Sequence, residues 1–462
     1  MASLLALLNS TSSALNTAQG LASTASNNVS NANTPGYTRQ TANLVDTGLR
    51  TLFDPGNVTI GSITQSRDRF LEAQVPVALG QAAFSQAKSD SLTAVSALDP
   101  SAARGLSAAL STFYSGLRGL SQNAGDPGLR RSAVASAQAL ASSFNQTSRE
   151  LGAAQTGLDA QLAGSVSEVS QAAATVASLN RQIRTAKASG QDANNLLDAR
   201  QRAQDRISEL TGALPIADAQ GDVSLSLPGG QPLVVGDQAN TLSAVVDPGG
   251  SGHLLLQLRD GSTGAQTVAS STVSGRLGGW LNARDSAIAD ASSALDLLAF
   301  DVGNAINTVS RGGYALDAST GHDLFTVGAF SGAAGRIAVA SDVAADPTLI
   351  AAAGSAAAGP GDATNLLAII ATETQSLSSG SAAGASFGAL VSRFGSASAA
   401  ANAEAAHDSA IKSHVTTLRE SASGVSIDEE LVNLQKAQRA YESISKVIAA
   451  AGEMLDTLLK LK

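Results

Sequence analysis

The residues with the most obvious potential for chemistry form a serine-hydrolase pattern in the last fifth of the chain. Residues 384–388 read Gly-Ala-Ser-Phe-Gly, which fits a G-x-S-x-G nucleophile motif, and Asp408 and His414 follow in the order of a Ser-Asp-His triad. That motif needs a buried strand just before the serine, because the strand-to-helix turn is what exposes the hydroxyl. Residues 378–383 are only serine, glycine and alanine, which cannot form such a strand. A secreted serine hydrolase that uses Ser386 is therefore a remote alternative, and we expect no enzyme.

The histidines are the remaining candidates for metal binding or proton transfer. His407 and His414 are seven residues apart, about two helical turns, which is too far to share a metal ion. His253 and His322 stand alone in turn-like segments, so we expect solvated side chains. Three carboxylates on predicted helices are also expected to be solvated charges: Glu72, Glu429 and Glu430. With no cysteine to form a thiolate site, the sequence predicts no metal and no cofactor.

Composition excludes two classes of partner. The net charge is −9, lysine and arginine are scattered, and only 3% of the residues are aromatic, so we expect no nucleic acid to bind. No apolar run approaches the roughly 20 residues that span a bilayer, so we expect no membrane insertion. The first basic residue is Arg39, so a signal peptide with a positive n-region is not expected either. If the protein leaves the cell, we expect another export route.

The elements that organise the chain are two helices at its ends. The N-terminal helix is predicted from apolar or small residues spaced by threes and fours, namely Leu4, Leu8, Thr11, Leu15, Ala18, Ala22, Ala25 and Val29. It must end near Asn33-Thr34-Pro35-Gly36, because proline disfavours helix before it and glycine permits the chain to turn. The C-terminal helix carries a matching stripe of Ile427, Leu431, Leu434, Ala437, Tyr441, Ile444, Ile448, Ala451, Leu455 and Leu458. Ser426 and Glu429 fit a capping box at its start.

The two stripes predict that the ends of the chain pair with each other. An ordinary intramolecular helical hairpin would explain that pairing alone. The N-terminal helix, however, carries further apolar residues at Leu5, Leu7 and Leu21 and has no charge before Arg39. A helix that is apolar on more than one face must be covered on more than one side. The pattern therefore favours contacts with other subunits.

Between its ends, the chain alternates helical and strand patterns. Helical spacing from about residue 127 to residue 188 predicts one long rod-forming helix that opens at Asp126-Pro127. Period-two alternation with turn signals between residues 214 and 273 predicts an antiparallel β insertion. Residues 58–63 and 336–340 read as further strands, and residues 365–377 as a helix.

The predicted fold class is mainly α with an inserted all-β domain, elongated and multi-domain, with the N- and C-terminal helices paired as a coiled coil. We expect three parts. Residues 1–45 with 422–462 form the terminal coiled coil, residues 46–212 with 276–421 an elongated helical domain with short β-hairpins, and residues 213–275 the antiparallel β domain.

Four segments together resemble bacterial flagellar axial proteins, and most closely the hook-associated protein 1 family. They are residues 26–40, which include Pro-Gly-Tyr-Thr-Arg at 35–39, the Arg-Asp-Arg-Phe-Leu segment at 67–71, residues 427–441, and the ending at 453–459. The first segment is also similar to rod and hook proteins, so a hook or rod subunit stays as an alternative.

The resemblance implies a structural subunit that self-assembles helically at the junction between hook and filament. It implies an extracellular place on the bacterial flagellum and export by the flagellar type III apparatus. The implied partners are copies of itself, the hook protein, a second hook–filament junction protein, and an export chaperone at the C-terminal helix. The residues expected at subunit interfaces are Leu4, Leu8, Leu15, Ala18, Ala22, Val29, Asn33, Pro35, Gly36, Tyr37, Ile427, Leu431, Leu434, Tyr441, Ile444, Ile448, Leu455 and Leu458.

Overall fold

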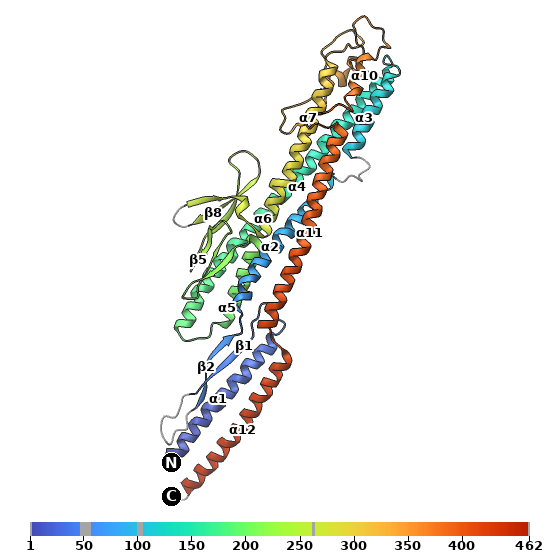
Figure 1. Cartoon of the computed structure of the whole chain (residues 1–462). Coiled ribbons are helices and arrows are strands. Elements are labelled where there is room, and N and C mark those ends of the chain that lie inside the picture. Colours follow the sequence, from blue (N-terminus) through green and yellow to red (C-terminus); the bar gives the residue numbers. More distant parts are fainter. Residues whose placement is uncertain (1, 47–56, 99–104, 261–263, 461–462) are drawn as a thin grey trace.

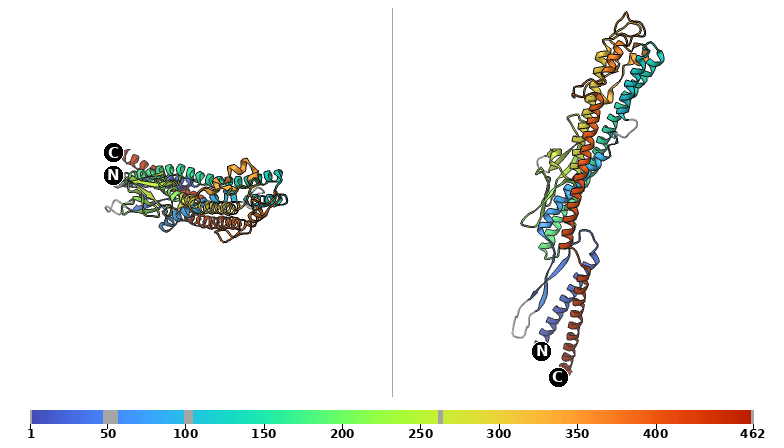
Figure 2. Two further views of the ribbon diagram at one scale, coloured as in Figure 1. Left: turned by 90° about the horizontal axis from the view of Figure 1, so that it is seen from above. Right: turned by 45° about the vertical axis from the view of Figure 1, so that its right-hand side comes forward.

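The protein is a long, narrow molecule with both chain ends at one tip (Figure 1). The computed structural model describes residues 2–46, 57–98, 105–260 and 264–460. Within these ranges the chain is mainly helical with small antiparallel sheets, and the two terminal helices are in contact, which confirms the predicted fold class. Two further views show the terminal pair extending beyond the end of a helical body (Figure 2).

The terminal end is built from two helices and a hairpin. Helix α1 (Ala2–Asn31) lies beside α12 (Ile427–Lys460), as predicted. Strands β1 (Gln40–Asp46) and β2 (Val58–Gln65) pair antiparallel, with Gln40 opposite Gln65. The hairpin lies against α1, where the Thr17 hydroxyl donates to the carbonyl of Val58 at 2.9 Å. The sequence predicted β2 but not β1, because β1 shows little alternation.

Long helices form the body. They are α2 (Arg69–Thr93), α4 (Pro127–Ala188), α5 (Asn194–Thr211), α6 (Gly275–Asn282), α7 (Ala289–Ser310) and α11 (Ala383–Ser423). The single helix predicted over 127–188 is confirmed as α4, with 62 residues. Asp126 caps it by accepting from the amide nitrogens of Gly128 and Leu129 at 2.7 and 2.8 Å. A six-residue π-helical turn, Ala283–Ile288, joins α6 to α7.

Helix α6 crosses α2 at a pair of glycines. A Cβ atom at Gly279 would lie 2.3 Å from the carbonyl oxygen of Phe84 on α2. Only glycine therefore allows the two helices to approach so closely.

Two small antiparallel sheets form the β insertion. The first has the order β3 (Leu214–Ala217), β4 (Val223–Ser226), β5 (Pro232–Val235), β6 (Gln238–Ala239). The second has the order β7 (Thr241–Val246), β8 (Leu254–Asp260), β9 (Gly264–Val268). Both lie to one side of the body (Figure 1). Their inward residues, such as Leu225 and Leu256, share one core with Leu162 and Val169 of α4.

The far tip carries the shorter elements, which are α3 (Leu106–Ser121), α8 (Ala333–Arg336), α9 (Ser341–Ala345), α10 (Thr364–Ala371), β10 (Phe325–Thr326) and β11 (Ala338–Val339). Two elements in this region are shorter than predicted. The strand expected over 336–340 is only β11, because α8 occupies its first residue. The helix expected over 365–377 ends at Ala371. Phe113, Phe144 and Leu295 belong to the large core of this half of the molecule.

Candidate functional site

The contact between α1 and α12 fully buries no large apolar side chain among the described residues. The described residues of the two helices that are buried are Thr17, Ala18, Thr24, Ala25, Asn28, Glu430, Ala437 and Ala451. Every one of them is an alanine or a polar residue. None of the three hydrophobic clusters among the described residues includes either helix. Because burying apolar area is the main source of stability, this pair is weakly held by its own contact.

Three of the larger residues expected at subunit interfaces are exposed in the single chain, and the other described ones are half-buried. Ile427, Leu431 and Tyr441 are 43%, 46% and 42% exposed. Half-buried positions are Leu8, Leu15, Ala22, Val29, Leu434, Ile444, Ile448 and Leu455. The side chains of Leu4 and Leu458 lie outside the described residues. The exposed apolar surface of α12 continues with Val432, Val447 and Met454.

The break after α1 is an exposed turn. Asn33, Pro35 and Gly36 are exposed, and Tyr37 is half-buried. Gly36 has a φ of +74°, the left-handed conformation that glycine adopts at least cost. A Cβ atom there would also lie 2.8 Å from Cγ of Arg202. The turn thus reverses the chain directly over α5.

A buried asparagine holds this turn against α1. The side chain of Asn28 is fully buried, and each of its polar atoms is used. Its Nδ2 donates to the carbonyl of Gln40 at 2.8 Å and to Oε2 of Glu430 at 3.1 Å. Its Oδ1 accepts from the Tyr37 hydroxyl at 2.9 Å and from the Gln40 amide at 3.0 Å. The buried Asn28 amide favours this one arrangement of α1, the turn and α12, because a different arrangement would leave its polar atoms without hydrogen-bond partners.

Glu430 connects the two ends of the chain. It is 3% exposed, and its Oε1 accepts from Nε and Nη2 of Arg39 at 2.8 and 2.7 Å. Nη1 of Arg39 lies 2.9 Å from Oε2 of Glu429. The expectation of a solvated charge was therefore wrong for Glu430, whereas the Glu429 side chain stays 62% exposed beside Arg39, and the half-buried Glu72 pairs with Arg67 at 2.6 Å. The reason is that the partner of each acid lies far away in the sequence or in a preceding loop.

Glu429 also departs from the predicted capping box. The Glu429 amide is 3.5 Å from the Ser426 hydroxyl, a weak contact, while its carboxylate is turned toward Arg39. The start of α12 is thus fixed chiefly by the segment that follows α1.

The Tyr37 hydroxyl acts as a hydrogen-bond donor at this site. Burial, followed by the nearby carboxylates of Asp198 and Glu430, raises the pKa of Tyr37 to about 12. The phenol therefore stays protonated over the physiological range, as its hydrogen bond to Asn28 requires.

The serine-hydrolase pattern does not form a site. Ser386, Asp408 and His414 all lie on the single helix α11. At a rise of about 1.5 Å per residue, Ser386 and His414 are roughly 40 Å apart. The Ser386 hydroxyl instead lies 2.8 Å from the hydroxyl of Ser379. No nucleophile and base meet at this motif.

The histidines behave differently from the prediction. Nδ1 of His253 lies 2.9 Å from Oδ2 of Asp159, and Nδ1 of His322 lies 2.8 Å from Oδ2 of Asp342, so neither stands alone. His407 and His414 are exposed on α11, as expected for solvated residues. Within the described ranges, no three histidine or acidic side chains gather in a way that could hold a metal ion. No described helix is both long enough and apolar enough to cross a membrane.

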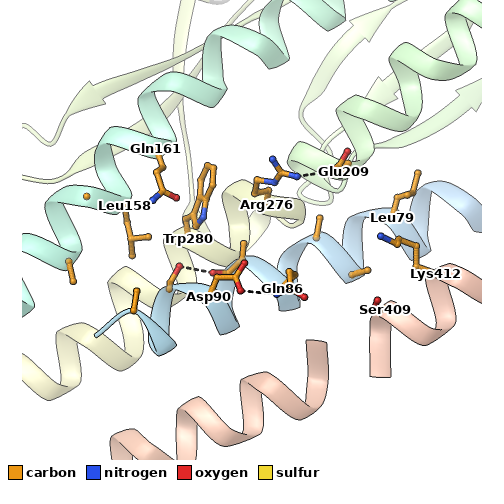
Figure 3. A pocket seen from close by; sticks show the side chains of 17 residues that line it. Leu79, Gln86, Asp90, Leu158, Gln161, Glu209, Arg276, Trp280, Ser409 and Lys412 are labelled. Carbon is orange, nitrogen blue, oxygen red and sulfur yellow. Dashed lines mark hydrogen bonds and ion pairs between the residues drawn. The ribbon is translucent and has the colours of Figure 1, made fainter. Parts of the chain in front are cut away.

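A cleft of about 680 Å³ lies between α2, α4, α6 and α11 (Figure 3). Trp280 lies among its lining residues, and its acidic groups are already occupied. Asp90 accepts from Nε2 of Gln86 at 2.8 Å, and Glu209 accepts from Nη2 of Arg276 at 2.5 Å. These acidic groups are held in pairs, and the described lining brings no nucleophile together with a base, so the cleft carries no catalytic assignment.

Sequence reasoning missed three residues at the terminal site, namely Asn28, Arg39 and Glu430. All three lie inside the segments that carry the family resemblance. No periodicity marks them, because Asn28 bonds across the turn after α1 and Glu430 reaches Asn28 and Arg39 from about 400 positions away.

Family models of flagellar proteins match both the helical body and the two terminal segments that meet at this site. The model described as "Flagellar hook-associated protein FlgK helical domain" matches residues 93–325. The models "Flagella basal body rod protein" and "Flagellar basal body rod FlgEFG protein C-terminal" match residues 8–38 and 419–461, which contain most of α1 and α12.

Individual relatives carry the same description. The chain is 27% identical to "Flagellar hook-associated protein 1" of Bacillus subtilis, over 96% of each protein. It is 27% identical to the protein of that name from Escherichia coli, over 70% of this chain. The matched part is only 60% of the Escherichia coli protein and 59% of the Salmonella typhimurium one, so the chain spans about three-fifths of those relatives.

A solved structure shares the fold. "The structure of the flagellar hook junction protein FlgK from Burkholderia pseudomallei" covers 76% of this chain and all of that one, with a TM-score of 0.69 at 17% identity. Since the helical-domain model spans half of the sequence, the chain belongs to the flagellar hook-associated protein FlgK family.

Proposed function

We propose that this protein is a structural subunit that joins the hook to the filament of a bacterial flagellum by self-assembly through its terminal helices. One observation carries the proposal. The α1–α12 pair fully buries only alanines and polar groups and leaves Ile427, Leu431 and Tyr441 exposed to solvent. Large exposed apolar residues along one element are typical of an interaction surface. The names of the relatives and of the solved structure place those proteins at the hook and its junction.

The proposed working parts follow the predicted division. Residues 1–45 with 422–462 would form the inter-subunit core that lines an axial channel. Residues 46–212 with 276–421 would surround that core, and residues 213–275 would lie outermost. In support, the β insertion lies beside the body, away from the terminal pair (Figure 1). The protein would transmit force and catalyse nothing.

The proposed partners are other copies of the chain, the hook protein and a second hook–filament junction protein. Before assembly, an export chaperone would cover the exposed stripe of α12, since free apolar surface invites aggregation. The proposed location is the extracellular flagellum, reached through the flagellar type III apparatus. These assignments come from the family resemblance, and the open stripe of α12 supports them.

A hook or rod subunit is the second candidate, because the two rod-family models match the terminal segments. Electron microscopy of a deletion strain separates the two. A junction protein predicts intact hooks without filaments and filament protein shed into the medium, whereas missing hooks would indicate the second candidate. Complementation by the full chain should restore filaments. A chain that ends at residue 424 should not, and restoration by it would contradict the role of α12.

A further inference from the structure

Three segments link the terminal pair to the body, and two of them bond to one side chain on α5. The chain crosses between the two parts at residues 38–40, 63–67 and 422–426. These crossings bond to one another, since the Arg39 amide donates to the carbonyl of Ser423 at 2.9 Å and the Ser66 amide donates to the carbonyl of Arg39 at 2.9 Å.

Asp198 is the point at which the body holds this bundle. Its carboxylate is 3% exposed and accepts from two separate crossings. From the first, the Thr38 hydroxyl donates at 2.8 Å and the Thr38 amide at 3.2 Å. From the second, Nε2 of Gln65 and Nη2 of Arg67 each donate at 2.8 Å. Hydrogen bonds to a buried carboxylate are stronger than neutral ones, because the ionised acceptor is poorly solvated.

Asn194, on the same face of α5 as Asp198, also bonds to the crossing at residues 63–67. Asn194, one turn before Asp198, donates from Nδ2 to the carbonyl of Ile63 at 2.9 Å. Its own carbonyl accepts from Nε2 of Gln65 at 3.0 Å. Residues 194 and 198 are four apart, so they lie on one side of the helix.

The Arg-Asp-Arg-Phe-Leu segment at 67–71 connects α2 to α5. Arg67 pairs with Asp198 on α5 and with Glu72 on α2. Asp68 caps α2 by accepting from the Phe70 amide at 2.8 Å. The segment therefore starts α2 and ties that start to α5 at once.

From these contacts we propose that Asp198 is a positioning residue that fixes the direction of the terminal helices relative to the body. Load that enters through α1 and α12 passes into α5 at this carboxylate. Without it, the first crossing loses its hydrogen bonds to α5 and the second keeps those of Asn194, so the terminal pair is held less firmly and swings. The mechanical consequence rests on the proposed junction function, whereas the clamp itself does not.

Hydrogen exchange on the purified full chain tests the clamp. In an Asp198→Ala variant, the amides of residues 38–40 and 63–67 should exchange at least about tenfold faster, the effect of losing bonds to a charged acceptor. Asp192→Ala is the matched control, because Asp192 is an exposed acid just before the same helix. It should leave those rates within about twofold of the parent. Unchanged exchange in Asp198→Ala would overturn the proposal.

Filament retention under shear tests the mechanical consequence. Cells that carry Asp198→Ala should assemble filaments but lose them in viscous medium several times more often than cells that carry Asp192→Ala. Equal loss would refute the load path. If Asp198→Ala loses amide protection in α4, Thr38→Val replaces it, because it removes only the Thr38 hydroxyl from the carboxylate. The amides of residues 38–40 should then exchange faster while those of 63–67 do not, and unchanged exchange at 38–40 would overturn the proposal. Failure of the junction function would instead appear as mislocalisation of the parent chain.

Discussion

Arg39 and Glu430 meet across 391 residues of sequence, with Nη2 of Arg39 lying 2.7 Å from Oε1 of Glu430. The arginine follows the turn after α1, and the glutamate lies in the first turn of α12. This ion pair and Asn28 set where the C-terminal helix begins relative to the N-terminal one. The two ends of the chain are thus registered by polar contacts, while their apolar residues remain free for other contacts.

Replacing Glu430 should loosen this registration much more than replacing its neighbour. Glu430→Ala removes the acceptor of Nε and Nη2 of Arg39 and one of the two acceptors of Asn28 Nδ2, and we expect a cost of about 1.5–3 kcal/mol. Glu429→Ala removes a largely exposed carboxylate, so less than about 1 kcal/mol is expected. Hydrogen exchange of the Gln40 amide, measured on assembled flagella, reports both. Equal effects of the two substitutions would contradict the assignment.

The Tyr37 pair with Asn28 should weaken only in strong alkali. Its folded pKa of about 12 lies above the ordinary value of 10.0. Its contribution to stability is therefore fully present below about pH 10 and is lost as the pH rises through about 12. A Tyr37→Phe variant should lose the contribution of Tyr37 at about pH 12 to the tyrosinate absorbance difference and keep that of Tyr114, whose pKa burial also raises, whereas Tyr441→Phe, at an exposed position, should retain both. Titration of Tyr37 near pH 10 in the parent would contradict the prediction.

Arg130 should be needed to hold the far tip. It is 1% exposed and donates to the carbonyls of Ala124 at 2.7 Å, Thr348 at 3.0 Å and Ile350 at 2.9 Å. Lysine cannot reach these acceptors with one ammonium group, so Arg130→Lys should cost about 2–4 kcal/mol in urea unfolding. Arg131→Lys, at the adjacent exposed position, should change stability by less than about 0.5 kcal/mol. A tolerated Arg130→Lys would show that the carbonyls find other donors.

The terminal pair should become strongly protected only on assembly. Its contact buries no large apolar side chain, and isolated helices are marginally stable in water. In the monomer, amides of residues 6–22 should therefore exchange much faster than those of α4, and assembly should slow them by orders of magnitude. Monomer protection equal to that of α4 would mean that the intramolecular pair suffices.

The sequence predicted what local patterns determine. Helix α4 was predictable because its Asp-Pro start and its apolar spacing lie within one continuous segment. The pairing of the chain ends was predictable because two stripes of matching period occur at the termini. The β insertion was predictable from its alternation and its turn glycines.

Contacts between distant polar residues were not predictable in the same way. Glu430 looks like an ordinary acid in a helical first turn, and its burial depends on Arg39 arriving from the other end of the chain. His253 was expected to be solvated, but Asp159, 94 residues earlier on α4, supplies a partner. The spacing of apolar residues predicts which face of a helix is apolar. It does not predict which polar side chains from distant segments will contact each other.

The location of the protein on isolated flagella tests the central claim most directly. Immunogold labelling with antibodies to residues 213–275, the proposed outermost part, should give one narrow band at the boundary between hook and filament. Flagella from a deletion strain are the control and should carry no label. Label along the hook, on the rod or along the filament would contradict the proposal that this chain forms the junction.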